Sequence, residues 1–546
     1  MTTKPWREVN AIYQIYPRSF QDSNGDGVGD IRGIIDRLDY IRGYKASLGI
    51  DAIWLSPIYT SPMADMGYDV SNYTNVDPLF GSLDDFKQLI ADAHTRNINV
   101  MLDFVPNHTS EQHPWFIESR SSRTNDKRDY YVWRDAKPDG SMPNNWLSIF
   151  GGPAWAWDEG RQQFYLHTFL KEQPDLNWDN PMVRDEMKRI IRFWMDLGVD
   201  GMRADAVRWM SKDPEFRDDP IDPTWRNDSH DKFGSLIHKY SRFWLNLFPY
   251  LRELTDIIAE YDNRIMIFED YPDPNLSTRE QYQGFYRINP DVSMPFNFEG
   301  IHLDFNAESF RHFVTDFQGM LDPKQHLPVY CFGNHDQPRM VSRYEGEDQA
   351  RLVAMMQLTL PGLPVVYYGD ELGMPNTRIE PEDIRDISAF SSGDISLSRD
   401  PSRTPMQWHK GPFAGFSDTK PWLPVGDSIR FHNVETATHE PDSMLSLYKR
   451  LLKLRANYEI FRKGSFEAFG EAESDVFVYA RRFEEEHIFI ALNFENKSRV
   501  VKLPHRGRVL CSTHPVDYPD MDEDTVNLRP FEGVVIECSE HPLQVR

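Results

Sequence analysis

The chain has 546 residues, more than one ordinary domain holds, and 40% of them are hydrophobic, so we expect two or three domains with large cores. The formal net charge of −25 argues against nucleic acid and anionic membranes as partners, because like charges repel. The sequence has no apolar run long enough to span a bilayer, and residues 1–13 lack the apolar core of a signal peptide.

The three cysteines, Cys331, Cys511 and Cys538, are odd in number and widely spaced. They predict neither a disulfide framework nor a zinc site, and they fit a reducing compartment. We therefore expect a cytoplasmic monomer or homodimer whose partners are small molecules.

Short apolar runs alternate with helix-like stretches from the N-terminus to about residue 460. Helical stretches are predicted at 83–97, 182–197 and 235–260. Eight strands with intervening helices favour an α/β fold, a (β/α)8 TIM barrel, over an open sheet. The predicted strands are Ala11–Tyr16, Ala52–Ser56, Val100–Val105, Gly201–Val207, Ile265–Glu269, Val292–Phe296, Pro328–Gly333 and Pro364–Tyr368.

Two stretches interrupt this alternation. Residues 105–173, after the third strand, are too long for a plain loop and predict an inserted subdomain. Residues 464–546 predict a C-terminal antiparallel β-sandwich, which leaves 1–104 and 174–463 as the two parts of the barrel. The strands expected in the C-terminal domain are Asp475–Arg481, His487–Asn493, Ser498–Leu503 and Gly533–Cys538.

Polar residues follow several of the predicted barrel strands. Barrel enzymes place their reactive groups at these carboxyl ends, where the strands share one mouth. Each group alone has an ordinary explanation, such as a structural ion pair, a solvated Glu or a satisfied core His. Their occurrence on separate strands of one barrel favours a common active site. The segments are Asp103–His108, Arg203–Asp205, Glu269–Asp270 and Asn334–Asp336.

The acids in these segments suit the cleavage of a glycosidic bond. Arg203 and Asp205 share a strand face, and an adjacent Arg lowers an Asp pKa and keeps it ionised, as a nucleophile requires. Glu269 follows the apolar run 265–268, which raises its pKa and favours the protonated acid. Two carboxyls in opposed environments are the usual equipment of glycoside cleavage. Asp336 is a third acid, suited to stabilise positive charge at the reacting carbon.

These segments resemble the ordered motifs of the α-amylase family, glycoside hydrolase family 13. The segment Gln173-Pro-Asp-Leu-Asn177 resembles the marker of its oligo-1,6-glucosidase and α-glucosidase branch. The similarity extends over nearly the whole chain. Other segments similar to this branch are Met66-Gly-Tyr-Asp69, Asn334-His-Asp-Gln-Pro-Arg339, Pro364-Val-Val-Tyr-Tyr-Gly-Asp-Glu371 and Arg399-Asp-Pro-Ser-Arg-Thr-Pro-Met-Gln-Trp408.

The resemblance implies catalytic roles for three residues. Asp205 would be the nucleophile, Glu269 the general acid/base and Asp336 the stabiliser of the transition state. The implied activity is that of a retaining α-glucosidase, which cleaves through a covalent glucosyl–Asp intermediate.

The resemblance also implies how the sugar is held. Asp69 would bind the non-reducing end of the glucose together with Arg403, with Arg399 as the less favoured candidate. Such a contact closes the pocket behind one glucose and implies exo action on short α-glucosides. The residues that would hold the reacting glucose are Tyr68, His108, Arg203 and His335.

Three positions depart from the family pattern. Met202 stands where Phe is usual, and Phe268 stands where Gly is usual before the acid/base. Ala206 follows the expected nucleophile, where Val accompanies α-1,6 preference and Thr accompanies α-1,4 preference in this branch. The linkage therefore stays open.

A second candidate site lies near the N-terminus, where oxygen-bearing residues alternate along the segment 22–30. Hard cations bind such oxygens, although Gly33 occupies the position where an EF-hand loop has Glu. A polar Gly-rich turn is the alternative. The resemblance implies a structural Ca²⁺ loop, with Mg²⁺ as the alternative ion. Its ligands would be Asp22, Asn24, Asp26, the carbonyl of Val28, and Asp30.

Two other functions are alternatives to hydrolysis. A transglucosylase or sucrose isomerase would form the same intermediate and intercept it with a sugar instead of water. A catalytically silent relative, acting as an interaction or transporter-associated subunit, is disfavoured by the intact Asp205, Glu269 and Asp336.

Overall fold

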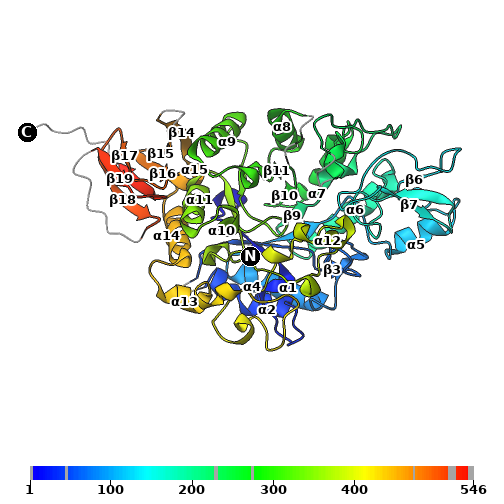
Figure 1. The fold of residues 1–546 in the computed structure, drawn as a ribbon, viewed down its shortest axis with the longest axis horizontal. Coiled ribbons are helices and arrows are strands. Elements are labelled where there is room, and N and C mark those ends of the chain that lie inside the picture. The colour runs from blue at the N-terminus through cyan, green and yellow to red at the C-terminus, as the bar shows by residue number, and fades with distance from the viewer. Residues whose placement is uncertain are drawn as a thin grey trace, which may run out of the picture.

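The computed structural model describes residues 4–43, 47–226, 232–271, 273, 276–470, 474–514 and 524–538. A central barrel lies between two smaller sheets, which occupy opposite ends of the long axis (Figure 1). Within the described residues, none of the helices is both long and apolar enough to cross a membrane.

Eight parallel strands form the barrel, which confirms the predicted fold. All of them are buried on both faces, so they read in the sequence as continuous apolar runs. The two edge strands are joined by a bridge between Asn297 and Tyr330, which closes the sheet. In spatial order the strands are β11 (Ser293–Pro295), β10 (Ile265–Phe268), β9 (Gly201–Ala204), β5 (Asn99–Phe104), β2 (Ala52–Leu55), β1 (Ile12–Ile15), β13 (Leu363–Tyr367) and β12 (Val329–Cys331).

The helices around the barrel begin at clear capping signals. Ser82 and Asp85 form a capping box at the start of α4, and Asn180 caps α6 ahead of Pro181. The helices are α1 (Pro17–Phe20), α2 (Ile31–Asp36), α3 (Leu38–Ile41), α4 (Leu83–Thr95), α5 (Pro114–Ser121), α6 (Pro181–Asp196), α7 (Leu247–Ile258), α8 (Thr278–Ile288), α9 (Ala307–Met320), α10 (Met340–Arg343), α11 (Glu347–Thr359), α12 (Ile387–Ser392), α13 (Val434–His439), α14 (Met444–Asn457) and α15 (Ile460–Lys463).

The helix predicted at 235–260 is wrong in its first half, because α7 begins only at Leu247. The preceding segment packs against the turn that follows β9 instead of coiling. Phe243 N donates to Arg208 O at 2.8 Å, and Phe243 has a positive φ of 52°. Tertiary contacts with that turn therefore override the local helical pattern.

The predicted insertion and C-terminal domain both contain their own sheets. Between β5 and α6 lies a three-stranded sheet of β6 (Trp133–Arg134), β8 (Gln163–Leu166) and β7 (Trp155–Asp158). A short pair, β3 (Tyr59–Thr60) and β4 (Asn72–Val76), precedes α4. The exact domain boundaries stay a prediction, and residues 539–546 of the last domain lie outside the described residues.

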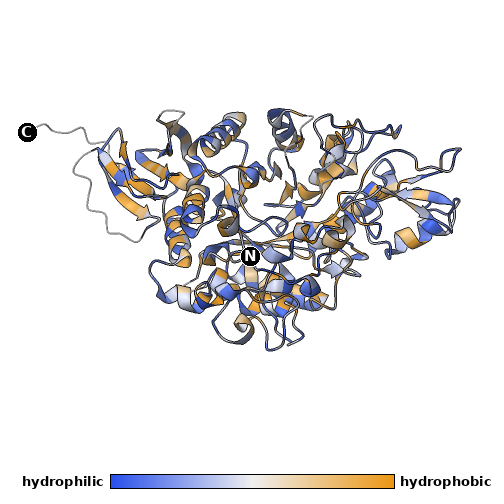
Figure 2. Cartoon of the chain, viewed as in Figure 1, coloured by the Kyte–Doolittle hydropathy of each residue, from blue (hydrophilic) through white to orange (hydrophobic). Residues whose placement is uncertain are grey.

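The C-terminal strands form an antiparallel five-stranded sheet and a facing pair, with an apolar layer between them. Hydrophobic residues run along these strands and those of the barrel in Figure 2. The four predicted strands are present, and the sequence pattern missed β14, β18 and β19. The larger sheet contains β14 (Ser465–Phe469), β15 (Val476–Phe483), β16 (Glu486–Asn493), β20 (Gly533–Cys538) and β18 (Gly507–Ser512), and the pair contains β17 (Arg499–Lys502) and β19 (Thr525–Leu528).

One buried arginine ties the C-terminal sheet to the barrel. Arg481 on β15 is fully buried and donates to the carbonyl oxygens of Ser465 at 3.0 Å and Gly464 at 2.8 Å. It also donates to the carbonyls of Thr359 and Phe461, which precede this domain in the chain. Without the guanidinium, these carbonyls would be buried and unpaired.

Arg481→Met should therefore lower the free energy of unfolding by at least about 3 kcal/mol, since each unpaired buried polar group costs roughly 1–3 kcal/mol. The matched control is Arg482→Met, because the neighbouring Arg482 side chain is 44% exposed and lies 3.1 Å from Glu467. That change should cost less than about 1 kcal/mol. Equal melting temperatures for the two variants in a thermal unfolding experiment would contradict this role.

Candidate active site

Asp205 and Glu269 occupy the first positions after β9 and β10. The register pairs Ala204 with Phe268, so the residues that follow them lie at the same level. The ladder continues for one more residue on each strand: Asp205 N donates to Phe104 O and Glu269 N to Ala204 O, both at 2.8 Å. The parallel register therefore brings two carboxyls to neighbouring positions at the barrel mouth.

One guanidinium holds three carboxyl groups at this mouth. Arg203 Nη1 lies 2.5 Å from Asp205 Oδ1 and 2.6 Å from Asp103 Oδ1, and Nη2 lies 3.1 Å from Glu269 Oε1. The Arg203 side chain is only 1% exposed, so water screens these interactions little. A single positive charge cannot balance three negative ones, which favours a proton on one of the acids.

The titration of the acids follows from this imbalance. Burial raises the pKa of Asp205 well above its usual value, and Glu269, through its charge and a hydrogen bond, and Asp103 raise it further against the attraction of Arg203. Our expectation that Arg203 alone would hold this pKa low is wrong. Asp205 therefore keeps its proton to a higher pH than a solvent-exposed aspartate would.

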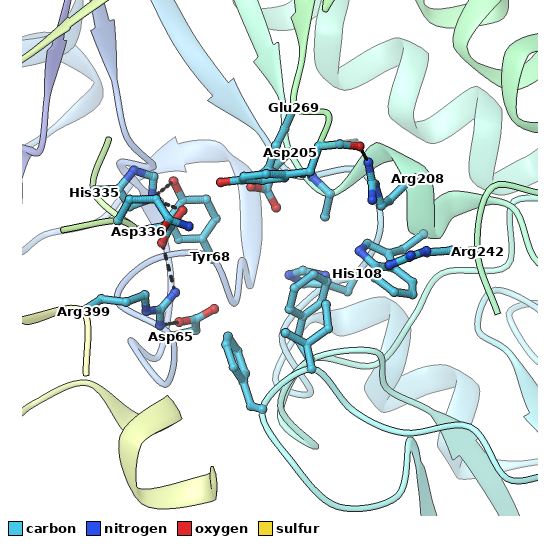
Figure 3. A pocket seen from close by; sticks show the side chains of 17 residues that line it. Asp65, Tyr68, His108, Asp205, Arg208, Arg242, Glu269, His335, Asp336 and Arg399 are labelled. Carbon is cyan, nitrogen blue, oxygen red and sulfur yellow. Dashed lines mark hydrogen bonds and ion pairs between the residues drawn. The ribbon is translucent and has the colours of Figure 1, made fainter. Parts of the chain in front are cut away.

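Tyr68 and His335 form a buried pair on the opposite side of the pocket from Arg208 and Arg242 (Figure 3). Their rings stack with 5.4 Å between centroids and a 4° angle between planes. Tyr68 Oη lies 2.7 Å from His335 Nε2, and Gln14 Nε2 lies 2.8 Å from His335 Nδ1. Burial lowers the pKa of His335 to about 3, so the ring is neutral and available for hydrogen bonding.

His108 comes from the segment after β5, as predicted, and lines the same pocket. Its Nε2 lies 3.0 Å from Gln173 Nε2, so the ring nitrogen accepts a hydrogen bond from that amide. Burial lowers the pKa of His108 to about 4. The residue is therefore a neutral, fixed group at the pocket wall.

Asp336 lies close to two guanidinium groups and to the neutral ring of His335. Arg403 Nη2 is 2.8 Å and Arg399 Nη1 is 3.2 Å from its Oδ1, and His335 Nε2 is 3.4 Å from its Oδ2. Burial alone would raise the pKa of Asp336, but the positive charges of Arg399 and Arg403 outweigh it and hold the pKa well below its usual range. This acid is therefore ionised throughout the ordinary pH range.

The prediction that Asp69 binds the glucose together with Arg403 does not fit the position of Asp69. The Asp69 carboxylate accepts hydrogen bonds from Ser61 Oγ and from the backbone N–H of Ala64 and Asp65, each at 2.9 Å. It thus shapes its own loop and does not line the pocket. Arg403 does not line the pocket either, but its guanidinium binds the carboxylate of Asp336, which does.

Asp65 and Arg399 take the place of that pair. Asp65 Oδ1 lies 2.9 Å from Arg399 Nη2, and both residues line the pocket beside Asp336 (Figure 3). Asp386 fixes Arg399 through a two-pronged contact, with Nε–Oδ2 at 2.9 Å and Nη2–Oδ1 at 2.7 Å. The sequence pattern missed Asp65. Its position directly before the Met66-Gly-Tyr68 segment is the signal that could have identified it.

The pocket has a volume of about 450 Å³, within the roughly 300–1,000 Å³ range of small-molecule sites. Ile149, Phe150 and Phe169 from the inserted subdomain form an apolar wall. The opposite wall includes Arg208 and Arg242, together with Trp209 and Tyr271. Sequence patterns did not reveal these residues, because they come from loops.

The two wall arginines are already paired with acids. Arg208 lies 2.8 Å from Asp270, and Arg242 lies 3.0 Å from Asp273. Two cations and two acids balance one another, so this wall suits a neutral ligand better than an anionic one.

The loop at 22–30 has the donor types that a hard cation needs. Asp22 and Asp30 are buried, and their carboxylates accept loop N–H groups at 2.7–3.0 Å. A carboxylate has about four acceptor positions. Asp22 already uses that number, since it also accepts from Ser417 Oγ at 2.6 Å, whereas Asp30 accepts three hydrogen bonds and keeps one position for a cation. In the described part of the chain, no three His, Cys, Asp or Glu side chains gather closely enough to hold a metal by themselves. A cation here would thus also need Asn24 and the Val28 carbonyl.

Sequence comparisons agree with this geometry. The model of the α-amylase catalytic domain matches residues 14–464. The oligo-1,6-glucosidase of Parageobacillus thermoglucosidasius is 37% identical, over 97% of this chain and 98% of its own length. A probable α-glucosidase of Rhizobium meliloti is 40% identical, over 92% of this chain and 91% of its own length.

Solved structures extend the comparison to enzymes that transfer or rearrange sugars. An α-glucosyl transfer enzyme is 37% identical, with a TM-score of 0.90 over 98% of this chain and 100% of its own. A mutant isomaltulose synthase of Erwinia rhapontici NX5, solved with its natural substrate sucrose, is 32% identical, with a TM-score of 0.87 over 98% and 99%. Since the family model covers most of its length and curated relatives match it end to end, the chain belongs to the α-amylase family and is a glycoside hydrolase of family 13.

Proposed function

We propose that this enzyme is a retaining exo-α-glucosidase that removes terminal α-linked glucose from disaccharides and short oligosaccharides of the maltose, isomaltose or sucrose type. The observation that carries the proposal is that Asp205 and Glu269 follow neighbouring strands in register and contact the same guanidinium, at 2.5 Å and 3.1 Å. Retaining enzymes have their two carboxyls about 5–5.5 Å apart, whereas inverting enzymes leave roughly 6.5–9.5 Å for a water. Two carboxyls that contact the same guanidinium support the short spacing of a retaining enzyme.

The proposed mechanism needs Asp205 ionised and Glu269 protonated. Asp205, as the carboxylate, attacks the anomeric carbon, while Glu269 donates its proton to the departing oxygen. The glycosidic bond breaks and a β-glucosyl ester forms on Asp205. Glu269, now a carboxylate, takes a proton from water, which attacks the anomeric carbon and releases α-glucose and free Asp205. Asp336, which its arginines keep ionised, stabilises positive charge on the sugar ring.

The closed end of the pocket supports exo action. Asp65, Arg399 and Asp336 form a charged wall in which each side chain is fixed by at least one other. Such a wall can bind the hydroxyl groups of a terminal glucose. Tyr68, His108 and His335 would complete the contacts to this sugar.

A transglucosylase or sucrose isomerase is the second candidate. The apolar wall of Ile149, Phe150 and Phe169 can hold an acceptor sugar and limit water, and two of the solved structures that resemble the chain are named for such reactions. The chemistry up to the glucosyl ester is the same in both cases. The products therefore separate the two functions.

We also propose that the 22–30 loop binds Ca²⁺ as a structural ion, with Asp22, Asn24, Asp26, Asp30 and the Val28 carbonyl as ligands. The oxygen donors and the negative charge of the loop support this. We place the enzyme in the cytoplasm, because Cys331, Cys511 and Cys538 are all unpaired, buried thiols.

The first test is the reaction itself. The purified chain, incubated with maltose, isomaltose, sucrose and soluble starch, should release single glucose units from the short substrates and act poorly on starch. Proton NMR before mutarotation should show α-glucose first, and Asp205→Asn should nearly abolish turnover without changing the melting temperature greatly. Initial β-glucose, or a rapid loss of starch viscosity, would disprove the proposal, and transfer products in place of glucose would favour the second candidate.

The second test uses pH. Because Glu269 raises the pKa of Asp205, Glu269→Gln should move the acidic limb of the activity profile to lower pH. Turnover of substrates with poor leaving groups should fall by about 10²–10⁴, whereas an activated aryl α-glucoside should be affected much less. An unchanged acidic limb with the aryl substrate would show that the two carboxyls are not coupled.

The third test concerns the metal. Exhaustive chelation should lower the melting temperature more than the turnover number, because an ion at 100 times its dissociation constant stabilises the fold by roughly 2.7 kcal/mol. Asp26→Ala should mimic chelation, since the Asp26 side chain makes its hydrogen bond only within the loop, to Val28 N at 2.8 Å. A melting temperature unchanged by chelation, with no metal found by elemental analysis, would contradict the site.

A further inference from the structure

We propose that Arg18 forms the base of a second binding site, separate from the sugar pocket, which takes a small oxyanion of the phosphate class. Arg18 lies in α1 and lines a cavity of about 290 Å³. None of the residues that line this cavity lines the central pocket.

The first reason is that Arg18 is a buried charge without an oxygen partner. Its residue exposure is 8%, and within the described residues its side chain forms no ion pair and donates only to sulfur, that of Met66 at 2.9 Å and of Met63 at 3.9 Å. A thioether is a weak acceptor, and Arg18 Nε is buried with no partner at all. A buried, unpaired charge is costly to the fold.

Two other buried arginines in this protein have oxygen acceptors for their guanidinium groups. Arg455 and Arg481 also lack a carboxylate, but their guanidinium groups donate to backbone carbonyl oxygens, such as Leu360 O at 2.9 Å and Gly464 O at 2.8 Å. Arg18 has no such carbonyl. An oxyanion in the adjoining cavity would supply the missing acceptors and the missing negative charge.

The second reason is the charge of the cavity wall. Arg385 and Lys420 line it together with Arg18, and the single acid in the lining is Asp383. Asp383 Oδ1 lies 3.5 Å from Lys420 Nζ and can balance only one of the three cations. An anion entering the cavity therefore meets a positive surface within a chain that is strongly negative overall.

The third reason is shape. Trp422 forms one side of the cavity, and the Arg18 guanidinium lies over its ring at 4.9 Å, which fixes the direction of the donor fork. At ~30 Å³ per water molecule, the volume corresponds to about ten waters, enough for a hydrated oxyanion. It lies at the lower limit of typical organic-ligand pockets, which favours a free inorganic ion over a larger metabolite.

The site also adjoins the loop that shapes the sugar pocket. Met63 and Met66 both have positive φ angles, 66° and 53°, which side-chain-bearing residues seldom adopt. Both contact Arg18, and the same loop carries Asp65 and Tyr68 into the sugar pocket. An anion that fixes Arg18 would thus act on a strained segment next to the active site.

The test is calorimetric titration of the full-length protein with inorganic phosphate, against chloride at equal ionic strength. We expect one phosphate site in the unmodified protein. Arg18→Met should abolish it without lowering the melting temperature in phosphate-free buffer, because an apolar side chain replaces an unpaired buried charge. If that variant does not fold, Lys420→Glu decides the question, since Lys420 is 75% exposed and its change should weaken phosphate binding about tenfold or more.

The matched control is Lys171→Glu. Lys171 is 72% exposed and lies 3.8 Å from Glu172, much as Lys420 lies near Asp383, but it does not line the cavity. This variant should bind phosphate like the unmodified protein. Two results would overturn the proposal. One is that phosphate binds no better than chloride. The other is that Lys420→Glu and Lys171→Glu bind phosphate equally well, which would mean that the phosphate binds elsewhere, for example in the sugar pocket. Titration with glucose 6-phosphate identifies the source, because tighter binding than free phosphate would indicate a phosphorylated sugar.

Discussion

The active site depends on one guanidinium that is shared by three acids. Arg203 contacts Asp103, Asp205 and Glu269 at 2.5–3.1 Å in a setting almost closed to water. If all three acids were ionised, two negative charges would stay unbalanced there, so the site keeps a proton. Retaining glycoside cleavage needs one acid protonated and its neighbour ionised. The charge imbalance favours one proton within this group of three acids, as the proposed mechanism requires.

The barrel makes this arrangement possible because its strands are parallel and in register. Asp103 on β5, Arg203 on β9 and Ile267 on β10 occupy one level of the sheet, and Asp205 and Glu269 follow at the mouth. An acid displaced by one residue along either strand would point to the other face of the sheet. The apolar strands therefore have a second effect besides stabilising the core, since they fix the spacing of the two reacting groups.

Much of this could be predicted from the sequence, and the exceptions have physical causes. The eight strands were recognisable because a strand buried on both faces is a continuous apolar run, and Asp205, Glu269 and Asp336 were recognisable because they follow such runs. The prediction named Asp69 and missed Asp65, because both lie in one loop and positive φ angles at Met66 and Gly67 decide which carboxylate faces the pocket. The pKa of Asp205 could not be deduced from Arg203 alone, since burial and the acids on β5 and β10 outweigh it.

The remaining arginines show how charge is distributed around the sugar pocket. Arg399 and Arg403 balance the acids of the closed end, and Arg208 and Arg242 balance Asp270 and Asp273 at the other wall. Each of these cations is therefore paired with an acid of the protein itself, which leaves the pocket suited to a neutral sugar. Arg18 differs, because among the described residues its side chain donates only to the thioethers of the loop that carries Asp65 and Tyr68. A guanidinium that the protein does not neutralise, beside a cavity with two further cations, is the position in this fold where an anion from solution would have the largest effect.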